Sequence, residues 1–168
     1  MRFHVKQKAI CFGDDFYLYD DNQKPLVFVD GRAFSFRNRL DLKSMEGQQL
    51  GFIRENMFAV REKYSFYVND SLHTRVVKRL NLINKDFLML VEGERECKIA
   101  GKYGLHDYRF VRDGEEIGRV SKDFFSWADG YTITVHKVKD ALPVVATTII
   151  IDQVLYEGTR SRGYSKSV

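Results

Sequence analysis

An apolar segment near the carboxyl end constrains the fold of this chain more than any other feature. The run from Ala141 to Ile151 is eleven residues long and contains one proline and two threonines. A helix that crosses a membrane needs roughly 20 apolar residues. The segment is too short for that, so it is expected to be buried within the protein itself.

The same segment is predicted to be a helix, although its β-branched residues favour a strand by propensity alone. Asp140 is a suitable N-cap, and Pro143 then falls in the first turn, where its missing N–H is tolerated. Apolar residues continue to Tyr156, and Gly158 follows as a stop signal. We therefore expect a helix from Asp140 to Tyr156, apolar nearly all round, with its threonine hydroxyls bonded to carbonyls one turn earlier.

Short runs of aromatic and β-branched residues, separated by polar turns, recur along the rest of the chain. Thirteen Phe and nine Tyr support strands, because flat rings pack well on a pleated surface. No segment between the runs has a helical stripe, and no Gly-rich phosphate-binding motif is present, so antiparallel hairpins are expected. The expected strands are Phe16–Tyr19, Leu26–Val29, Leu50–Ile53, Met57–Val60, Tyr64–Val68, Thr74–Arg79, Asp86–Val91, Lys98–Gly101, Tyr108–Val111, Glu116–Val120 and Tyr131–Val135.

Helix and strands together predict a closed barrel. About eleven antiparallel strands form a barrel too wide for its own side chains to fill, and a helix that must be surrounded on every side would fill it. The 168 residues fit one domain. We expect a single barrel domain over residues 1–158, followed by a frayed basic tail over residues 159–168.

The order of these elements resembles the LURP-one-related proteins. The resemblance lies in the Tyr- and Phe-rich hairpins, the strand Asp129-x-Tyr131-x-Ile133-x-Val135, a short polar link and the terminal segment from Leu142 to Asp152. Those proteins belong with the tubby C-terminal domain and the phospholipid scramblases in one superfamily. The resemblance implies a twelve-stranded antiparallel barrel around a hydrophobic C-terminal helix. It also implies a non-enzymatic role, since tubby domains bind phosphoinositide head groups and scramblase-type members act at lipid bilayers.

Charge and composition exclude several other classes. Lys and Arg number 27 against 23 Asp and Glu, a net charge of +4 that falls short of a nucleic-acid-binding footprint. Charges interrupt the first eight residues, so no signal peptide is expected and the protein is predicted to be cytoplasmic, at most peripherally associated with a membrane. Cys11 and Cys97 lie far apart with no CxxC motif, and both are expected to be free thiols.

The densest basic stretch runs from Arg32 to Lys43 and holds four cations, one anion and two phenylalanines. Guanidinium groups bind phosphate through paired N–H donors, so Arg32, Arg37 and Arg39 are candidates for binding an anionic head group. The alternative is a strand with its phenylalanines inward and its charges in solvent. The same two interpretations apply to a second basic group and to the basic residues of the tail: Arg75, Lys78, Arg79 and Lys85; Arg160, Arg162 and Lys166.

We expect no catalytic, cofactor-binding or metal-binding residues. Of the four histidines only His106 neighbours a carboxylate, Asp107, and adjacent strand residues point to opposite faces. Trp127 is predicted to be a packing residue. The acidic residues near the N-terminus lack the spacing of a calcium-binding loop and indicate solvated turns: Asp14, Asp15, Asp20 and Asp21.

The leading functional hypothesis is a non-catalytic binding or scaffold module that contacts anionic phospholipid head groups, including phosphoinositides. Two alternatives remain open. One is a carrier of a small apolar ligand inside the barrel, which requires an empty interior. The other is a scramblase-like lipid-handling protein.

Overall fold

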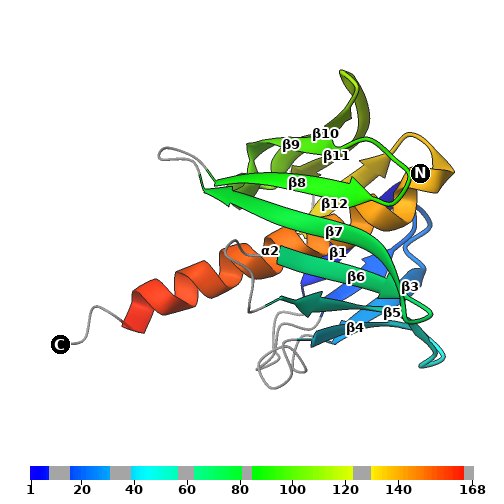
Figure 1. Cartoon of the computed structure of the whole chain (residues 1–168). Coiled ribbons are helices and arrows are strands. Elements are labelled where there is room, and N and C mark those ends of the chain that lie inside the picture. The colour runs from blue at the N-terminus through cyan, green and yellow to red at the C-terminus, as the bar shows by residue number, and fades with distance from the viewer. Residues whose placement is uncertain (8–15, 31–38, 57–62, 81–84, 123–129, 165–168) are drawn as a thin grey trace.

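Twelve antiparallel strands form a closed barrel around one long helix in the computed structural model, which describes residues 1–7, 16–30, 39–56, 63–80, 85–122 and 130–164 (Figure 1). The strands are β1 (Arg2–Gln7), β2 (Phe16–Tyr19), β3 (Pro25–Asp30), β4 (Arg39–Ser44), β5 (Gln49–Glu55), β6 (Lys63–Val68), β7 (Ser71–Leu80), β8 (Lys85–Val91), β9 (Cys97–Lys102), β10 (Asp107–Arg112), β11 (Glu115–Lys122) and β12 (Gly130–Val135). A short 3-10 helix, η1 (Tyr103–Leu105), precedes β10. A second one, η2 (Val138–Asp140), leads directly into the helix α2 (Ala141–Tyr164).

The barrel is a continuous meander. Each strand pairs with its neighbours in sequence, and β1 closes the ring by pairing with β12, where Phe3 lies opposite Ile133. The predicted barrel architecture is therefore confirmed. Ten of the expected strands coincide with observed ones, and the expected strand Met57–Val60 lies outside the described residues.

The sequence pattern does not predict β1 and β4. Each strand carries only two apolar residues on its inner side, Phe3 and Val5 in β1 and Leu40 and Leu42 in β4. Two apolar residues between charged ones are too few for an alternation to stand out. Pairing with two neighbouring strands supplies what the local sequence lacks.

Helix α2 runs through the barrel, and its last turns project from one end (Figure 1). Every residue from Val144 to Ile151 is buried, and the helix packs against inward rings such as Phe66, Phe87 and Phe110. The central prediction, that this segment is a helix enclosed by strands, is confirmed. Within the described residues, no helix combines the length and apolar character required to cross a membrane.

Three details of the helix differ from prediction. Its α-helical part begins at Ala141, and the carboxylate of Asp140 accepts a hydrogen bond from Arg112 at 2.7 Å, so this side chain binds the barrel wall. Gly158 does not end the helix, which continues to Tyr164 into the expected tail. An interior glycine costs only about 1 kcal/mol and no proline follows it. The hydroxyl of Thr148 donates to the Val144 carbonyl at 2.9 Å as expected, whereas the buried Thr147 hydroxyl has no partner among the described residues.

Polar side chains fasten α2 to the wall at both ends of the barrel. At the proximal end, where α2 begins, the Arg112–Asp140 pair is buried, with Glu94 3.5 Å from Arg112. At the distal end, where α2 leaves the barrel, His106 Nε2 lies 2.9 Å from Asp152 Oδ1. The helix is therefore held along its length by apolar packing and at each end by a specific polar contact.

Candidate functional site

Of the three arginines predicted to bind an anion, the structure describes Arg39. Arg32 and Arg37 lie outside the described residues. Arg39 is the first residue of β4, and its Nε donates to Asp41 Oδ1 at 2.8 Å. Its guanidinium carbon also lies 3.9 Å from the centroid of the Phe52 ring, a cation–π contact. Arg39 is therefore held in place on the outer wall.

The register of the sheet places Arg39 beside two arginines that are distant in sequence. Arg39 pairs with Arg54 on β5, Arg54 pairs with Ser65 on β6, and Ser65 pairs with Arg75 on β7. We call Arg39, Arg54 and Arg75 the arginine row. Strands lie about 4.8 Å apart, so three spacings make the row about 14 Å long.

Strand alternation turns the arginine row outward. The residues that flank its members, such as Leu40, Ile53 and Val76, are buried among the core side chains. Successive residues of a strand face opposite sides of the sheet. Ser65 lies between Arg54 and Arg75 in the register. Its side chain is short and the residue is 8% exposed, so it leaves the outer surface to the arginines on either side.

Charge balance differs along the row. Arg39 has Asp41 as a counterion, and the neighbouring Lys43 is paired with Asp30 at 3.2 Å. Arg54 and Arg75 are exposed, and neither forms an ion pair or hydrogen bond within the part of the chain that the structure describes. Like charges opposite each other on adjacent strands repel, so an anion bound across the row would be stabilised.

Sequence reasoning found two members of this row without connecting them. Arg39 and Arg75 stood in separate basic groups, and Arg54 was not singled out because it lies alone in its strand. The rest of the second group divides. Lys78 is 9% exposed, Arg79 lies 3.8 Å from Glu96, and the side chain of Lys85 is outside the described residues. Only the register between strands could have revealed the row.

His106 does not use the neighbouring carboxylate. Instead of Asp107, its imidazole contacts Asp152 of α2 and stacks on the Tyr131 ring, with centroids 4.3 Å apart. Burial, together with the charge of Asp152, raises the pKa of both Tyr108 and Tyr131 well above the usual tyrosine value. These tyrosines therefore remain protonated, and the cluster fastens the β9–β10 connection to the helix.

The acidic residues near the N-terminus include a structured turn. Oδ1 of Asp20 accepts the backbone N–H groups of Asn22 and Lys24, both at 2.9 Å. Asp21 lies 3.4 Å from Arg2 and 3.2 Å from His4, while Asp14 and Asp15 are outside the described residues. Across the described ranges, no three His, Cys, Asp or Glu side chains gather as metal ligands would.

Of the two cysteines and the tryptophan, the structure describes Cys97 only. Its thiol is free and buried, and burial raises its pKa to about 11. Nucleophilic cysteines have a lowered pKa, so this thiol is a packing group. Cys11 and Trp127 lie outside the described residues.

Comparison with known proteins gives concordant results. A family model described as LURP-one-related matches residues 1–152. The uncharacterized protein YxjI of Bacillus subtilis (strain 168) is 27% identical over 153 residues, which cover 90% of this chain and 92% of that protein. The crystal structure of an Arabidopsis thaliana protein, AT5G01750, superposes with a TM-score of 0.65 at 12% identity and covers 91% of each chain. At that identity the superposition shows a shared fold.

Proposed function

The chain belongs to the LURP-one-related family, and from that premise we propose that it is a non-catalytic barrel module that binds anionic phospholipid head groups at a membrane surface. In this proposal the protein is cytoplasmic and associates with the membrane peripherally. The observation that carries the proposal is the arginine row on the outer wall of β4 to β7.

The chemistry of the row suits phosphate groups spread over a surface. Each guanidinium offers paired N–H donors to a phosphate, and the row holds them along about 14 Å of wall. The exposed Arg54 and Arg75 have no counterion among the described residues to displace. Arg32 and Arg37, which precede Arg39 in the chain, are further candidate phosphate donors in this proposal.

The expected affinity is modest. A basic residue close to an anionic bilayer contributes about 1 kcal/mol, so three arginines would contribute about 3 kcal/mol. Binding of this strength is reversible and weakens with salt, because exposed charges are screened over about 10 Å at 0.1 M ionic strength. Peripheral and salt-sensitive association is therefore the expected behaviour.

The occupied interior disfavours the alternative of an apolar-ligand carrier. Such a carrier holds its ligand in the lumen, and here the buried side chains of α2 from Val144 to Ile151 lie in that position. A polar head group bound on the outer wall needs no change in the core.

Vesicle co-sedimentation tests the proposal. Wild-type protein should sediment with phosphatidylcholine vesicles that contain phosphatidylserine or a phosphoinositide, and should remain in solution with phosphatidylcholine alone. The double variant Arg54→Glu, Arg75→Glu should bind at least about 30-fold more weakly, because each lost arginine is worth about 1 kcal/mol and each new carboxylate is repelled by the anionic surface. A second double variant, Arg32→Glu with Arg37→Glu, tests the two predicted residues in the same assay.

The matched control is Lys24→Glu with Lys137→Glu, which changes the net charge equally but at exposed positions at the proximal end. It should reduce binding by less than about threefold, since these lysines lie away from the row. Equal losses in the control and in the Arg54, Arg75 variant would show that only total charge matters. That result, or equal recovery with neutral and anionic vesicles, refutes the proposal.

A further inference from the structure

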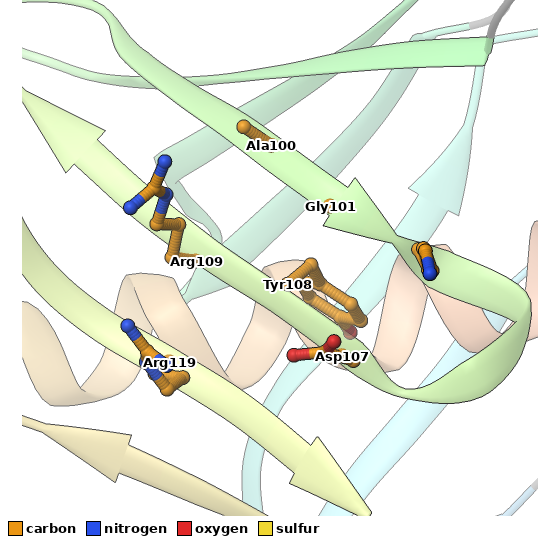
Figure 2. Close-up of a pocket in the computed structure, with 7 residues that line it drawn as sticks. Ala100, Gly101, Asp107, Tyr108, Arg109 and Arg119 are labelled. Carbon is orange, nitrogen blue, oxygen red and sulfur yellow. The ribbon is translucent and has the colours of Figure 1, made fainter.

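A second basic feature lies on another part of the outer wall, over β9, β10 and β11. The surface there is hollowed by a pocket of about 300 Å³. Figure 2 shows Arg109 and Arg119 on neighbouring strands at one side of this pocket, with Asp107 at the other. The residues that matter to its chemistry are Ala100, Gly101, Lys102, Asp107, Arg109 and Arg119.

Small residues create the hollow. Ala100 lies opposite Arg109 in the β9–β10 pairing, and Gly101 lies opposite Tyr108. Gly101 is required by close approach, because a Cβ there would lie 2.3 Å from the Asp107 carbonyl oxygen. With only a methyl group at the exposed Ala100, the outer wall between Lys102 and the arginines stays open.

Two like charges face each other in the pocket. Arg109 pairs directly with Arg119 across β10 and β11, an arrangement that is unfavourable unless the charges are compensated. The Arg119 guanidinium is compensated by Glu116 through hydrogen bonds of 3.1 and 2.8 Å. Arg109 and Lys102 are exposed, and neither has an ion-pair or hydrogen-bond partner within the described ranges.

We propose that this pocket binds a compact phosphate-bearing anion, with Arg109 as its principal donor and with Lys102 and Arg119 as supporting charges. Arg109 supplies the paired N–H groups that suit a phosphate or phosphomonoester. The volume of about 300 Å³ is at the small end for ligand sites and fits one such group with a short substituent. Asp107 at the rim disfavours a second anionic group on that side.

The site is separate from the arginine row. The row lies on β4 to β7 and the pocket on β9 to β11, with β8 between them in the barrel. The inference goes beyond the proposed function and does not depend on it. A variant on β10 leaves the row intact, so the two ideas fail independently.

Titration calorimetry of the full chain at constant ionic strength tests the site. The probes are inorganic phosphate and glycerol 3-phosphate, with chloride as the reference anion. Wild-type protein should bind one equivalent of a phosphate probe, and Arg109→Ala should weaken binding at least tenfold, because the paired hydrogen bonds between charged groups are lost. Lys98→Ala, an exposed cation on β9 that does not line the pocket, should change affinity by less than about twofold.

Ala100→Leu tests the contribution of the pocket's shape separately from that of its charged residues. It fills the pocket at an exposed position and removes no cation, so it should also weaken binding at least tenfold. Binding of wild-type protein and of Arg109→Ala to vesicles that contain phosphatidic acid shows whether the pocket takes a soluble phosphate or one presented by a bilayer. The inference is overturned if neither phosphate source shows a loss with Arg109→Ala, or if Ala100→Leu binds as tightly as wild type.

Discussion

Arg112 is the charged residue that is most completely removed from water in the described barrel wall. Its side chain is 8% exposed, and its Nη1 lies 2.7 Å from Asp140 Oδ1. The Nε of Arg112 and Oδ2 of Asp140 are buried without a hydrogen-bond partner among the described residues. A buried pair of this kind gains little beyond its desolvation cost, but loss of one member leaves the other poorly compensated: Asp140 would lose its guanidinium partner, and Arg112 would keep only Glu94, at 3.5 Å.

We therefore predict that Asp140→Ala lowers the free energy of unfolding by about 3–5 kcal/mol in urea denaturation. Arg112→Met combined with Asp140→Leu should be more stable than the single variant, because no charge is then left buried. As a control, Arg95→Ala breaks the exposed Arg95–Asp113 pair and should cost less than about 1 kcal/mol. Equal effects of Asp140→Ala and Arg95→Ala would contradict this account of the pair.

Valine substitution at the two buried threonines of α2 should change the free energy of unfolding in opposite directions. Thr147 carries a hydroxyl without a partner in the described structure, whereas Thr148 donates to the Val144 carbonyl. Thr147→Val removes an unsatisfied polar group and should raise the free energy of unfolding by about 1 kcal/mol. Thr148→Val removes a hydrogen bond and should lower it by about 0.5–1 kcal/mol. Chemical denaturation of both variants measures the difference, and a shift of the same sign in both would refute the prediction.

At the scale of elements, what the sequence predicts well is what depends on local alternation. Strands such as β2 and β6 have aromatic runs bounded by turn residues, and their positions follow from that pattern. The helix follows from burial logic, because a segment that is apolar all round must be enclosed. Its C-terminal limit does not, since Gly158 signals a stop that the backbone does not obey.

The candidate sites depend on register, which the sequence does not state. Arg39 and Arg75 are 36 positions apart in the chain yet belong to one row across β4 to β7. His106 likewise contacts Asp152, 46 residues away, rather than its neighbour Asp107. Barrel closure brings such residues together, and no local pattern records which partners will meet.

The close pairing of β9 and β10 gives a prediction at this scale. Gly101 adopts a φ of 147°, and an added Cβ would lie 2.3 Å from the Asp107 carbonyl oxygen and 2.5 Å from Tyr108 Cα. Because both neighbours are backbone atoms, Gly101→Ala should destabilise the protein by about 2–4 kcal/mol. Thermal or urea unfolding would measure this loss.

Gly114 provides the matched control for Gly101. It has a φ of 81° in the β10–β11 turn, and an added Cβ there meets no atom within 4 Å. Gly114→Ala should therefore cost only the conformational penalty of about 1–2 kcal/mol. A loss at Gly101 no greater than that at Gly114 would show that the two strands can separate to admit a side chain.

At the scale of the whole molecule, charge is distributed unevenly between the proximal end and the walls. The connections at the proximal end, residues 20–24, 45–48, 69–70, 92–96, 113–114 and 136–140, hold nine acidic residues against four basic ones. The arginine row and the β9–β11 pocket both lie on the walls. An anionic surface would repel the proximal end and attract the walls. The barrel should therefore approach such a surface either with its side wall or with the end from which the C-terminal part of α2 emerges.

The packing of the barrel as a whole predicts a loss of stability at high pH. Burial raises the pKa of Tyr103 to about 12 and raises that of Tyr108 and Tyr131 as well. In the unfolded chain these groups ionise near pH 10. The unfolded state therefore releases protons first, and the stability present below pH 10 declines as the pH rises toward and beyond 12.

Each such tyrosine should steepen the decline by about 1.4 kcal/mol per pH unit above 10. Tyr131→Phe tests this directly, because it removes one of the buried ionisable hydroxyls and leaves the ring in place. Relative to its own stability near neutral pH, the variant should lose stability less steeply than wild type above pH 10, by about 1.4 kcal/mol per unit. Urea denaturation at stepped pH, with tyrosinate absorbance recorded in parallel, measures both quantities.

Cys97, whose pKa is also raised by burial, is present in both proteins and cancels in the comparison. Identical slopes for the two proteins would mean that Tyr131 reaches solvent in the folded state, and that the wall around α2 opens more readily than its packing implies.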